Sequence, residues 1–239
     1  MPMAERIQKL ISQAGLASRR QAERWIEEGK VLLNGRKAGL GDRADLTVDK
    51  VEVAGRALQA AEKKITVLLN KPRGYISTLK DPGERRLVTE LVADIPARLF
   101  PIGRLDYNTE GLLLLSNDGD LALRLTHPRH HVKKTYLVKG RGRLTSDMIG
   151  QLEQGVMIDQ YKTAPAQVAK VRNSATTCWF ELTISEGKNR QVRRMCDAIG
   201  ISVVRLKRIG LGGLDLGGLE TGRYRLLSAA EVARLKKIN

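Results

Sequence analysis

Four consecutive leucines, Leu112–Leu115, constrain the fold of this chain more than any other part of its sequence. They directly follow Gly111, and a short continuous apolar run of this kind predicts a strand buried in the core. Asp106 lies shortly before this run. An ionised carboxylate that leaves water without a partner costs several kcal/mol or shifts its pKa. Asp106 is therefore either an exposed aspartate in a turn, which is common for this residue type, or a reactive carboxylate held at the edge of the core.

The charge of the chain indicates the class of its partner. There are 42 Lys and Arg residues against 26 Asp and Glu residues, a formal net charge of +16 with a pI near 10.1. Such an excess favours a polyanion, most often nucleic acid, over a membrane surface. Residues 1–60 carry a net charge of +3 and residues 61–239 one of +13, so the strongest positive potential is expected on the second part.

No signal-peptide pattern follows Met1, and no apolar run approaches the ~18 residues that a membrane span requires. The two cysteines, Cys178 and Cys196, have neither the CxxC spacing of a zinc site nor the number that a disulfide framework needs. A cytoplasmic protein that does not bind a membrane is expected.

The N-terminal part reads as two short helices and a hairpin. Apolar residues at helical spacing predict one helix over Glu5–Ala14, and a second begins after Ser18, whose partner Gln21 completes a capping box. Asn34-Gly35 predicts a tight hairpin turn. Arg19, Arg20 and Arg24 project from one end of this unit, either as an RNA-binding surface or as a solvated charged face. A polar stretch then places a domain boundary near Ala61.

The second part predicts a mixed, mainly antiparallel α+β domain, because strand-like runs outnumber helical ones and hairpin turns join several of them. Among these elements we expect strands at Tyr75–Thr78 and Val203–Leu206 and a short helix at Val88–Val92. No GxGxxG, GxxxxGK[ST] or HExxH pattern is present in the sequence. The three histidines, in one basic loop, lack a carboxylate at ligand spacing, so no metal site is predicted. An enzyme built on this chain would use Asp106 with basic or hydroxyl groups.

Four sequence motifs, taken together, resemble those of a known family. They are Lys71-Pro72-Arg73-Gly74, the segment from Gly103-Arg104-Leu105-Asp106 through Thr109 to Gly111–Leu114, Lys134-Thr135-Tyr136, and Glu186-Gly187-Lys188-Asn189-Arg190-Gln191-Val192-Arg193-Arg194-Met195. Their order is similar to that in the RsuA/RluB family of ribosomal RNA pseudouridine synthases. Residues 5–53 resemble the small αL-type RNA-binding domain that this family carries in front of its catalytic domain. The resemblance implies an RNA-binding domain over residues 1–60 and a pseudouridine synthase domain over residues 64–239.

The resemblance also implies an activity, in which a uridine of folded ribosomal RNA is isomerised without metal, nucleotide or other cofactor. Asp106 matches the essential carboxylate, acting as nucleophile or as base at the sugar. Lys188 matches the basic residue that pairs with it, and a close cation would keep a partly buried aspartate ionised. Tyr136 matches the tyrosine that stacks on the target base. Arg104 matches an arginine suited to filling the space that the base leaves, and Leu206 is a looser match to an apolar residue at the floor of the pocket.

The basic residues around these motifs are the expected RNA contacts. They are Lys71, Arg73, Lys133, Lys134, Arg190, Arg193 and Arg194. Extruding a base costs a few kcal/mol, and phosphate contacts can offset this cost. The Asn189-Arg190-Gln191 version of the last motif is more similar to family members that act on large-subunit RNA. The expected partner is structured ribosomal RNA, bound by a monomer.

Two other interpretations predict different behaviour. A non-catalytic ribosomal RNA-binding or assembly factor would use the same charge while Asp106 only shapes a loop. A DNA-binding regulator would bind duplex DNA and structured RNA with comparable affinity at equal salt.

Overall fold

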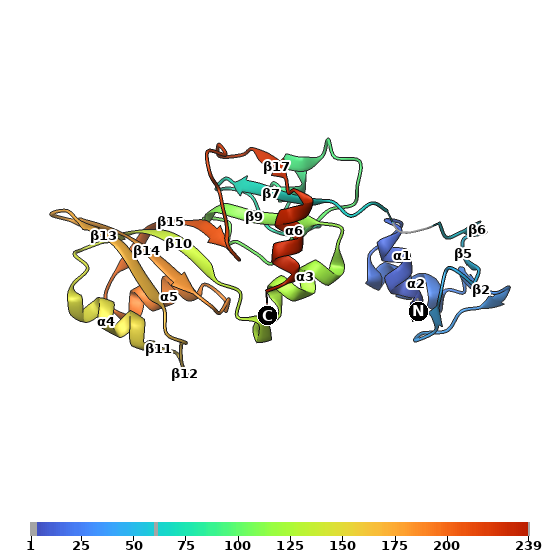
Figure 1. The fold of residues 1–239 in the computed structure, drawn as a ribbon, viewed down its shortest axis with the longest axis horizontal. Helices are drawn as coiled ribbons and strands as arrows, with labels where there is room; N and C mark the ends of the chain where they lie inside the picture. The colour runs from blue at the N-terminus through green and yellow to red at the C-terminus, as the bar shows by residue number, and fades with distance from the viewer. Residues whose placement is uncertain (1–3, 60–61, 239) are drawn as a thin grey trace. The chain divides into compact units, whose positions relative to one another are not determined.

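The computed structural model describes residues 4–59 and 62–238, which form two compact units (Figure 1). The first consists of the chain up to Ile65 together with Asn117–Gly119, and the second of Thr66–Ser116 and the chain from Asp120 onward. The boundary that the sequence places near Ala61 lies outside the described residues. None of the helices described in either unit is both long and apolar enough to cross a bilayer.

The first unit packs two helices and a small sheet around one core. Its helices are α1 (Ile7–Gln13) and α2 (Arg19–Glu27). Its four-stranded sheet has the order β3-β2-β5-β6, formed by Arg36–Lys37, Val31–Leu33, Val51–Val53 and Arg56–Ala57, and β1 (Glu5–Arg6) pairs separately with β4 (Arg43–Ala44). Ile7, Ile11, Ala22, Ile26 and Val31 are buried together, as their helical and strand spacing predicts.

The N-cap of α2 and the hairpin turn form as the sequence indicates, although only the Ser18 half of the predicted capping box is among the described bonds. The Ser18 hydroxyl accepts a hydrogen bond from the backbone N–H of Gln21 at 3.2 Å and so caps α2. Asn34 and Gly35 both adopt positive φ, 50° and 82°, which is the conformation that a tight hairpin between β2 and β3 requires. The predicted first helix is shorter than expected, because Glu5 and Arg6 pair with β4 instead.

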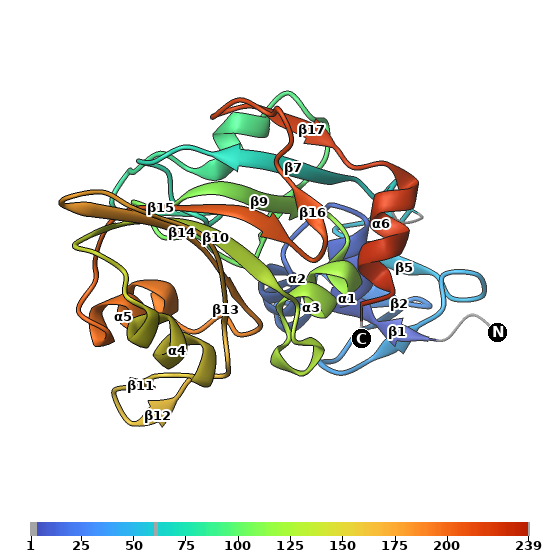
Figure 2. The same ribbon diagram turned by 60° about the vertical axis from the view of Figure 1, so that its left-hand side comes forward.

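The second unit is built on a nine-stranded sheet with the order β13-β14-β10-β15-β9-β7-β17, in which β16 also pairs with β15 and β8 with β9 (Figure 2). In sequence order the strands are β7 (Thr66–Lys71), β8 (Phe100–Ile102), β9 (Glu110–Ser116), β10 (Lys134–Arg141), β13 (Gln167–Asn173), β14 (Thr177–Ile184), β15 (Ser202–Leu211), β16 (Leu214–Asp215) and β17 (Tyr224–Leu226). All the pairs described in this sheet are antiparallel except β9 with β15. The predicted mixed, mainly antiparallel sheet is therefore confirmed.

Helices cover this sheet in two groups. The helices are α3 (Gly119–Thr126), α4 (Ser146–Gln154), α5 (Gln191–Ala198) and α6 (Ala229–Lys236), with 3-10 turns η1 (Val88–Val92) and η2 (Pro128–His130) and a small hairpin of β11 (Met157–Ile158) and β12 (Tyr161–Lys162). Helices α4 and α5 lie near β10, β13 and β14, and α3 and α6 lie at the other end of the sheet (Figure 2). Two separate apolar cores result, one around Phe180 and Met195 and one around Leu114 and Leu121.

Strand β9 carries the four leucines, which are all fully buried. At its start Gly111 adopts φ +104° and pairs with Arg208 of the parallel strand β15. A Cβ atom at position 111 would lie 2.1 Å from the Arg208 carbonyl oxygen. Only glycine combines this backbone conformation with so close an approach, and the parallel contact of β9 and β15 depends on it.

The strand predicted at Tyr75–Thr78 is wrong, since this segment is irregular and only Ile76 forms an isolated bridge, to Leu87. The Ser77 hydroxyl instead donates to the Leu105 carbonyl at 3.0 Å and accepts from the Leu105 N–H at 3.2 Å. A side chain thus replaces the expected backbone pairing. It ties the segment to the loop that carries Asp106.

Candidate active site

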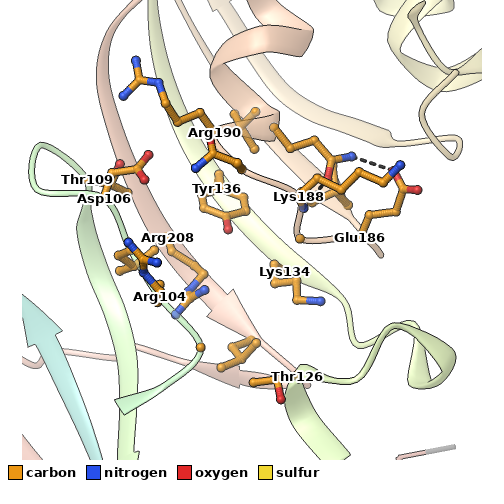
Figure 3. Close-up of a pocket in the computed structure, with 18 of the residues that line it drawn as sticks. Arg104, Asp106, Thr109, Thr126, Lys134, Tyr136, Glu186, Lys188, Arg190 and Arg208 are labelled. Carbon is orange, nitrogen blue, oxygen red and sulfur yellow. Dashed lines mark hydrogen bonds between the residues drawn. The ribbon is translucent and has the colours of Figure 1, made fainter. Parts of the chain in front are cut away.

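A cavity of about 550 Å³ opens where strands β10 and β15 meet the loops around residues 103–109 and 185–190 (Figure 3). Its volume is in the range of small-ligand sites, about 300–1,000 Å³. The cavity brings together seven of the residues that the sequence singles out: Arg104, Asp106, Lys134, Tyr136, Lys188, Arg190 and Leu206. These side chains come from four separate segments of the chain, so only the folded sheet unites them.

Strand alternation explains why part of this set shares one face. In β10, Lys134 and Tyr136 are two residues apart and project to the same side of the sheet. In the neighbouring β15, Arg208 lies opposite Tyr136 and Leu206 lies opposite Val138. Cross-strand partners project to the same face, so Leu206 and Arg208 join Tyr136 and Lys134 along the cavity wall.

Asp106 lies in a loop whose backbone is held by a buried lysine. The side chain of Lys71 is fully buried, and its ammonium group donates to the carbonyls of Asp106 at 3.1 Å, Thr109 at 2.9 Å and Pro72 at 3.1 Å. These bonds use all three donors of the ammonium group. The sequence-based prediction that Lys71 contacts RNA is therefore wrong: the last residue of β7 turns inward.

The same loop has further backbone supports. The Thr109 N–H donates to the Asp106 carbonyl at 3.0 Å, and the Gly74 N–H donates to the Tyr107 carbonyl at 3.0 Å. With Ser77 on Leu105, these bonds fix the loop from both sides while the half-buried Asp106 side chain faces the cavity (Figure 3). A reactive carboxylate needs such preorganised support.

The ion pair expected between Asp106 and Lys188 is not formed in this structure. The Lys188 ammonium lies over the ring of Tyr161, 3.2 Å from the ring centroid, and points toward Glu186 and away from Asp106 (Figure 3). The face of an aromatic ring attracts a cation. The Lys188 side chain is exposed and long enough to reach the Tyr161 ring. Tyr161 therefore competes with Asp106 for the ammonium group of Lys188.

Arg193 and Lys71 supply the positive charge beside Asp106. The Arg193 guanidinium donates to the Asn108 carbonyl in the Asp106 loop and to the Val203 carbonyl, each at 3.4 Å. Burial lowers the pKa of Arg193, and the nearby positive charge of Arg190 adds to this, while the negative charge of Asp106 raises it. Arg193, predicted as an RNA contact, therefore faces the loop that carries Asp106 with part of its side chain.

The other residues predicted to contact RNA differ in whether their charged groups already pair with acids of the protein. Arg190 and Lys133 are exposed. Arg73 is half-exposed but forms an ion pair with the buried Glu110 at 2.9 Å, and Arg194 pairs with Asp159. Arg19, Arg20 and Arg24 are exposed on α2 of the first unit.

Sequence reasoning missed Thr109 and Arg208 as cavity residues. Both are buried, with exposed fractions of 2% and 5%, and both line the cavity. The sequence does carry one signal for Arg208, because it lies two residues after Leu206 on the same strand and therefore on the same face. In the described residues no group of three or more His, Cys, Asp or Glu side chains could hold a metal ion.

The burial of Lys71 predicts a dependence of stability on pH. Burial lowers the pKa of Lys71 from 10.5 to about 8, although the charges of Asp106 and Glu110 act against this. At pH values between about 8 and 10.5, Lys71 in the folded protein has released a proton that Lys71 in the unfolded chain still holds. The free energy of unfolding should therefore rise with pH in this window, by at most ~1.4 kcal/mol per pH unit from this group.

Denaturant unfolding of the wild type and of Lys71→Met, at several pH values between 8 and 10, checks this expectation. Subtracting the variant removes the titration of all other groups. The stability difference in favour of the wild type should grow with pH; a difference that stays constant or shrinks would contradict the inward, desolvated position of Lys71.

Comparisons with known proteins agree with this architecture. Residues 65–198 match the family model of RNA pseudouridylate synthase, and residues 5–46 match the S4 domain. The chain is 45% identical to ribosomal large subunit pseudouridine synthase B of Bacillus subtilis strain 168, over 98% of this chain and 96% of that protein. It is 42% identical to an uncharacterized RNA pseudouridine synthase of Aquifex aeolicus strain VF5, over 98% and 95% of the two chains. A crystal structure of a pseudouridylate synthase superposes with a TM-score of 0.69 at 30% identity, covering 96% of this chain and 99% of that one.

Proposed function

Because the chain belongs to the RNA pseudouridylate synthase family and carries an S4 domain in front of its catalytic domain, we propose that it isomerises a specific uridine to pseudouridine in large-subunit ribosomal RNA. The observation that carries this proposal is the cavity in which Asp106 and Tyr136 lie together, in a chain similar over almost its full length to a ribosomal large subunit pseudouridine synthase. A ribosomal RNA substrate supports a cytoplasmic location, which is part of this proposal. We also propose that the protein acts as a monomer.

The reaction exchanges one bond of the uracil for another. The bond from N1 of uracil to C1′ of the sugar breaks, the base turns, and C5 bonds to C1′; C5 then loses its proton and N1 gains one. Asp106 acts on the sugar as nucleophile or as base. Tyr136 projects into the cavity from β10 and would stack on the base, and Leu206 on the adjacent strand contributes the apolar floor.

The cations around Asp106 support this role. A carboxylate in a partly buried site stays ionised when positive charge lies close to it. Lys71 and Arg193 provide that charge in the absence of RNA. Lys188 borders the same cavity, so a change of its side-chain rotamer could bring it from Tyr161 toward Asp106 once a uridine is bound.

RNA capture is assigned to exposed basic residues. Arg19, Arg20 and Arg24 lie on α2 of the S4 domain, Lys133 lies outside the cavity, and Arg190 lines the cavity with an exposed side chain. Nine aromatic residues in the whole chain offer little base stacking. Recognition then depends on phosphate contacts and RNA shape.

Replacing the three α2 arginines by glutamine should weaken RNA capture and leave the chemical step intact. Each lost phosphate contact should reduce the slope of log affinity against log salt by about 0.7 to 0.9. We expect KM for the natural RNA to rise and single-turnover rates at saturating protein to stay near the wild-type value. A salt titration of RNA binding, together with those rates, measures both effects.

A matched control is the pair Lys30→Gln and Lys50→Gln, in the same domain. These lysines already pair with Glu28 at 2.6 Å and Glu52 at 3.1 Å, so their loss should alter the salt slope much less. Equal effects of the two sets would contradict a specific role for the α2 arginines.

The proposal is tested by incubating the purified protein with unmodified transcripts of large- and small-subunit ribosomal RNA and mapping pseudouridine at single-nucleotide resolution. We expect conversion of one uridine, or of very few, in the large-subunit transcript only. Conversion in the small-subunit transcript instead would overturn the substrate assignment. Tight binding without conversion of either transcript, or of large-subunit RNA in assembling particles, would favour an assembly factor.

A further inference from the structure

A buried guanidinium group with one unpartnered nitrogen lines the active-site cavity. Arg208 is only 5% exposed, and its Nε donates to the Leu112 carbonyl at 2.7 Å, which fixes the side chain. Its Nη2 atom is buried and has no hydrogen-bond partner in the described structure. A buried donor left without an acceptor is costly, so this geometry suits a site that a ligand completes.

Lys134 provides a second cation in the same part of the cavity. Its side chain projects from the same face of the sheet as Arg208, and both residues line the cavity. The only hydrogen bond described for its ammonium group is a long one, 3.5 Å, to the Ser185 carbonyl. Burial lowers the pKa of Lys134, and the positive charge of Arg208 lowers it further, so the two cations repel each other.

The acids of the cavity do not neutralise these two groups. The carboxylate charge of Asp106 acts on Lys71 and Arg193. Glu186 accepts hydrogen bonds from Gln191 Nε2 at 2.6 Å and from the Ala164 N–H at 3.1 Å. In the described part of the chain, neither Lys134 nor Arg208 forms an ion pair. In the view of Figure 3 both of them lie below the hydroxyl end of Tyr136, and Asp106 lies to the left of that ring.

We propose that Lys134 and Arg208 form a phosphate site inside the cavity, which binds a phosphodiester group directly adjoining the extruded uridine. This inference rests on the proposed function and adds a recognition element to it. A phosphate offers a negative charge and several acceptor oxygens, which match a guanidinium N–H and an ammonium group at once. A uracil carbonyl is neutral and would leave two close cations uncompensated.

The role of this phosphate site is to position the nucleotide. Arg208 is anchored through Nε, so a phosphate on its Nη2 is held at a fixed place relative to Tyr136, its cross-strand neighbour. The sugar attached to that phosphate would then be directed toward Asp106. Contacts outside the cavity hold the RNA, whereas this one aligns the reacting residue.

The test uses a fragment of the target RNA, synthesised with natural phosphates or with one neutral methylphosphonate on the 5′ or the 3′ side of the modified uridine. Single-turnover rates and RNA affinities are measured for the wild type, Lys134→Gln and Lys133→Gln. Lys133 is the matched control, because it carries the same charge one residue away but does not line the cavity. Thermal unfolding confirms that each variant is folded.

For the wild type, one of the two methylphosphonates should lower the rate by roughly ten- to a hundredfold, as expected for lost charge-assisted hydrogen bonds. In Lys134→Gln the same methylphosphonate should lower the rate only a few-fold, because the lysine that would bind the phosphate is already missing. In Lys133→Gln it should cost as much as in the wild type. Arg208→Lys, which keeps a charge but loses the fork of donors, should be impaired even on natural RNA.

Equal losses in the wild type and Lys134→Gln, or no loss at either position, would overturn the phosphate site while leaving the activity on natural RNA intact. If Lys134→Gln instead reduced the effect of a 4-thiouridine substitution and not that of a methylphosphonate, the acceptor would be the base. That result would also overturn the phosphate site. Absence of any conversion of natural RNA by the wild type would instead defeat the proposed function, and this inference with it.

Discussion

Asp106→Asn is expected to abolish pseudouridine formation, with a loss of rate on the order of 10⁴-fold or more, as for other single groups that perform the chemical step. The amide has nearly the same shape as the carboxylate but carries no charge and is a poor nucleophile and base. The loop should keep its conformation, because Lys71 and the Thr109 N–H bind the carbonyl oxygen of residue 106, which the substitution retains. Binding of the RNA fragment should therefore stay close to that of the wild type.

The matched control is Asp147→Asn, which removes the same charge from the exposed first turn of α4, outside the cavity. It should leave the rate unchanged within a few-fold. Rates are measured by pseudouridine mapping of a synthetic transcript over time, and affinities by equilibrium binding at fixed salt. Retained conversion in Asp106→Asn would contradict the catalytic assignment, and loss of RNA binding would show that Asp106 serves a structural purpose.

Gly111→Ala is expected to be strongly damaging to the fold, although it adds only one methyl group. The new methyl group would lie 2.1 Å from the Arg208 carbonyl oxygen, and residue 111 would have to keep φ at +104°. Backbone strain and the lost parallel contact of β9 with β15 together should lower the free energy of unfolding by ~3 kcal/mol or more. Because Asp106 lies just before β9 and Arg208 on β15, activity should fall as well.

Gly150→Ala is the corresponding control, since Gly150 lies within α4 and a Cβ atom there would meet nothing within 4 Å. Alanine favours the helix, so stability should rise by up to ~1 kcal/mol. Urea unfolding of both variants at one pH measures the two effects. A Gly111→Ala protein as stable as the wild type would contradict the close approach of the two strands.

Features that depend on neighbouring residues could be predicted from the sequence. The leucine run folds as a buried strand, Asn34-Gly35 forms the hairpin turn, and Ser228 with Glu231 forms the capping box that begins α6. In each case the backbone and side-chain groups that decide the structure lie within a few residues. The cavity set was accessible too, through the resemblance to a family, as Asp106, Tyr136 and Leu206 all line the cavity.

Features that depend on residues far apart in the sequence could not be predicted in this way. Lys71 reads as an exposed loop cation, but its neighbour across the sheet is Gly111, and three carbonyls converge on its ammonium group. Burial there follows from pairing between strands that are some forty residues apart in the sequence. Arg208 is a similar case, since its inward direction depends on its register with Tyr136.

The position of Lys188 illustrates a third kind of limit. Its motif indicates a partner for Asp106, but the sequence gives no sign that Tyr161, on the β11–β12 hairpin, offers a competing aromatic face. An exposed lysine has many rotamers of similar energy, and which of them is populated depends on whether substrate is present. The motif therefore predicts the identity of the residue better than its position.

The central claim, that Asp106 performs the isomerisation of a ribosomal RNA uridine, is tested most directly in cells. Pseudouridines are mapped in ribosomal RNA from cells that lack this protein and carry either the wild-type chain, Asp106→Asn or neither. We predict that one large-subunit position is pseudouridine only when the wild-type chain is present, and remains uridine with the variant although the variant is equally abundant. The same pseudouridine pattern in all three would contradict the account.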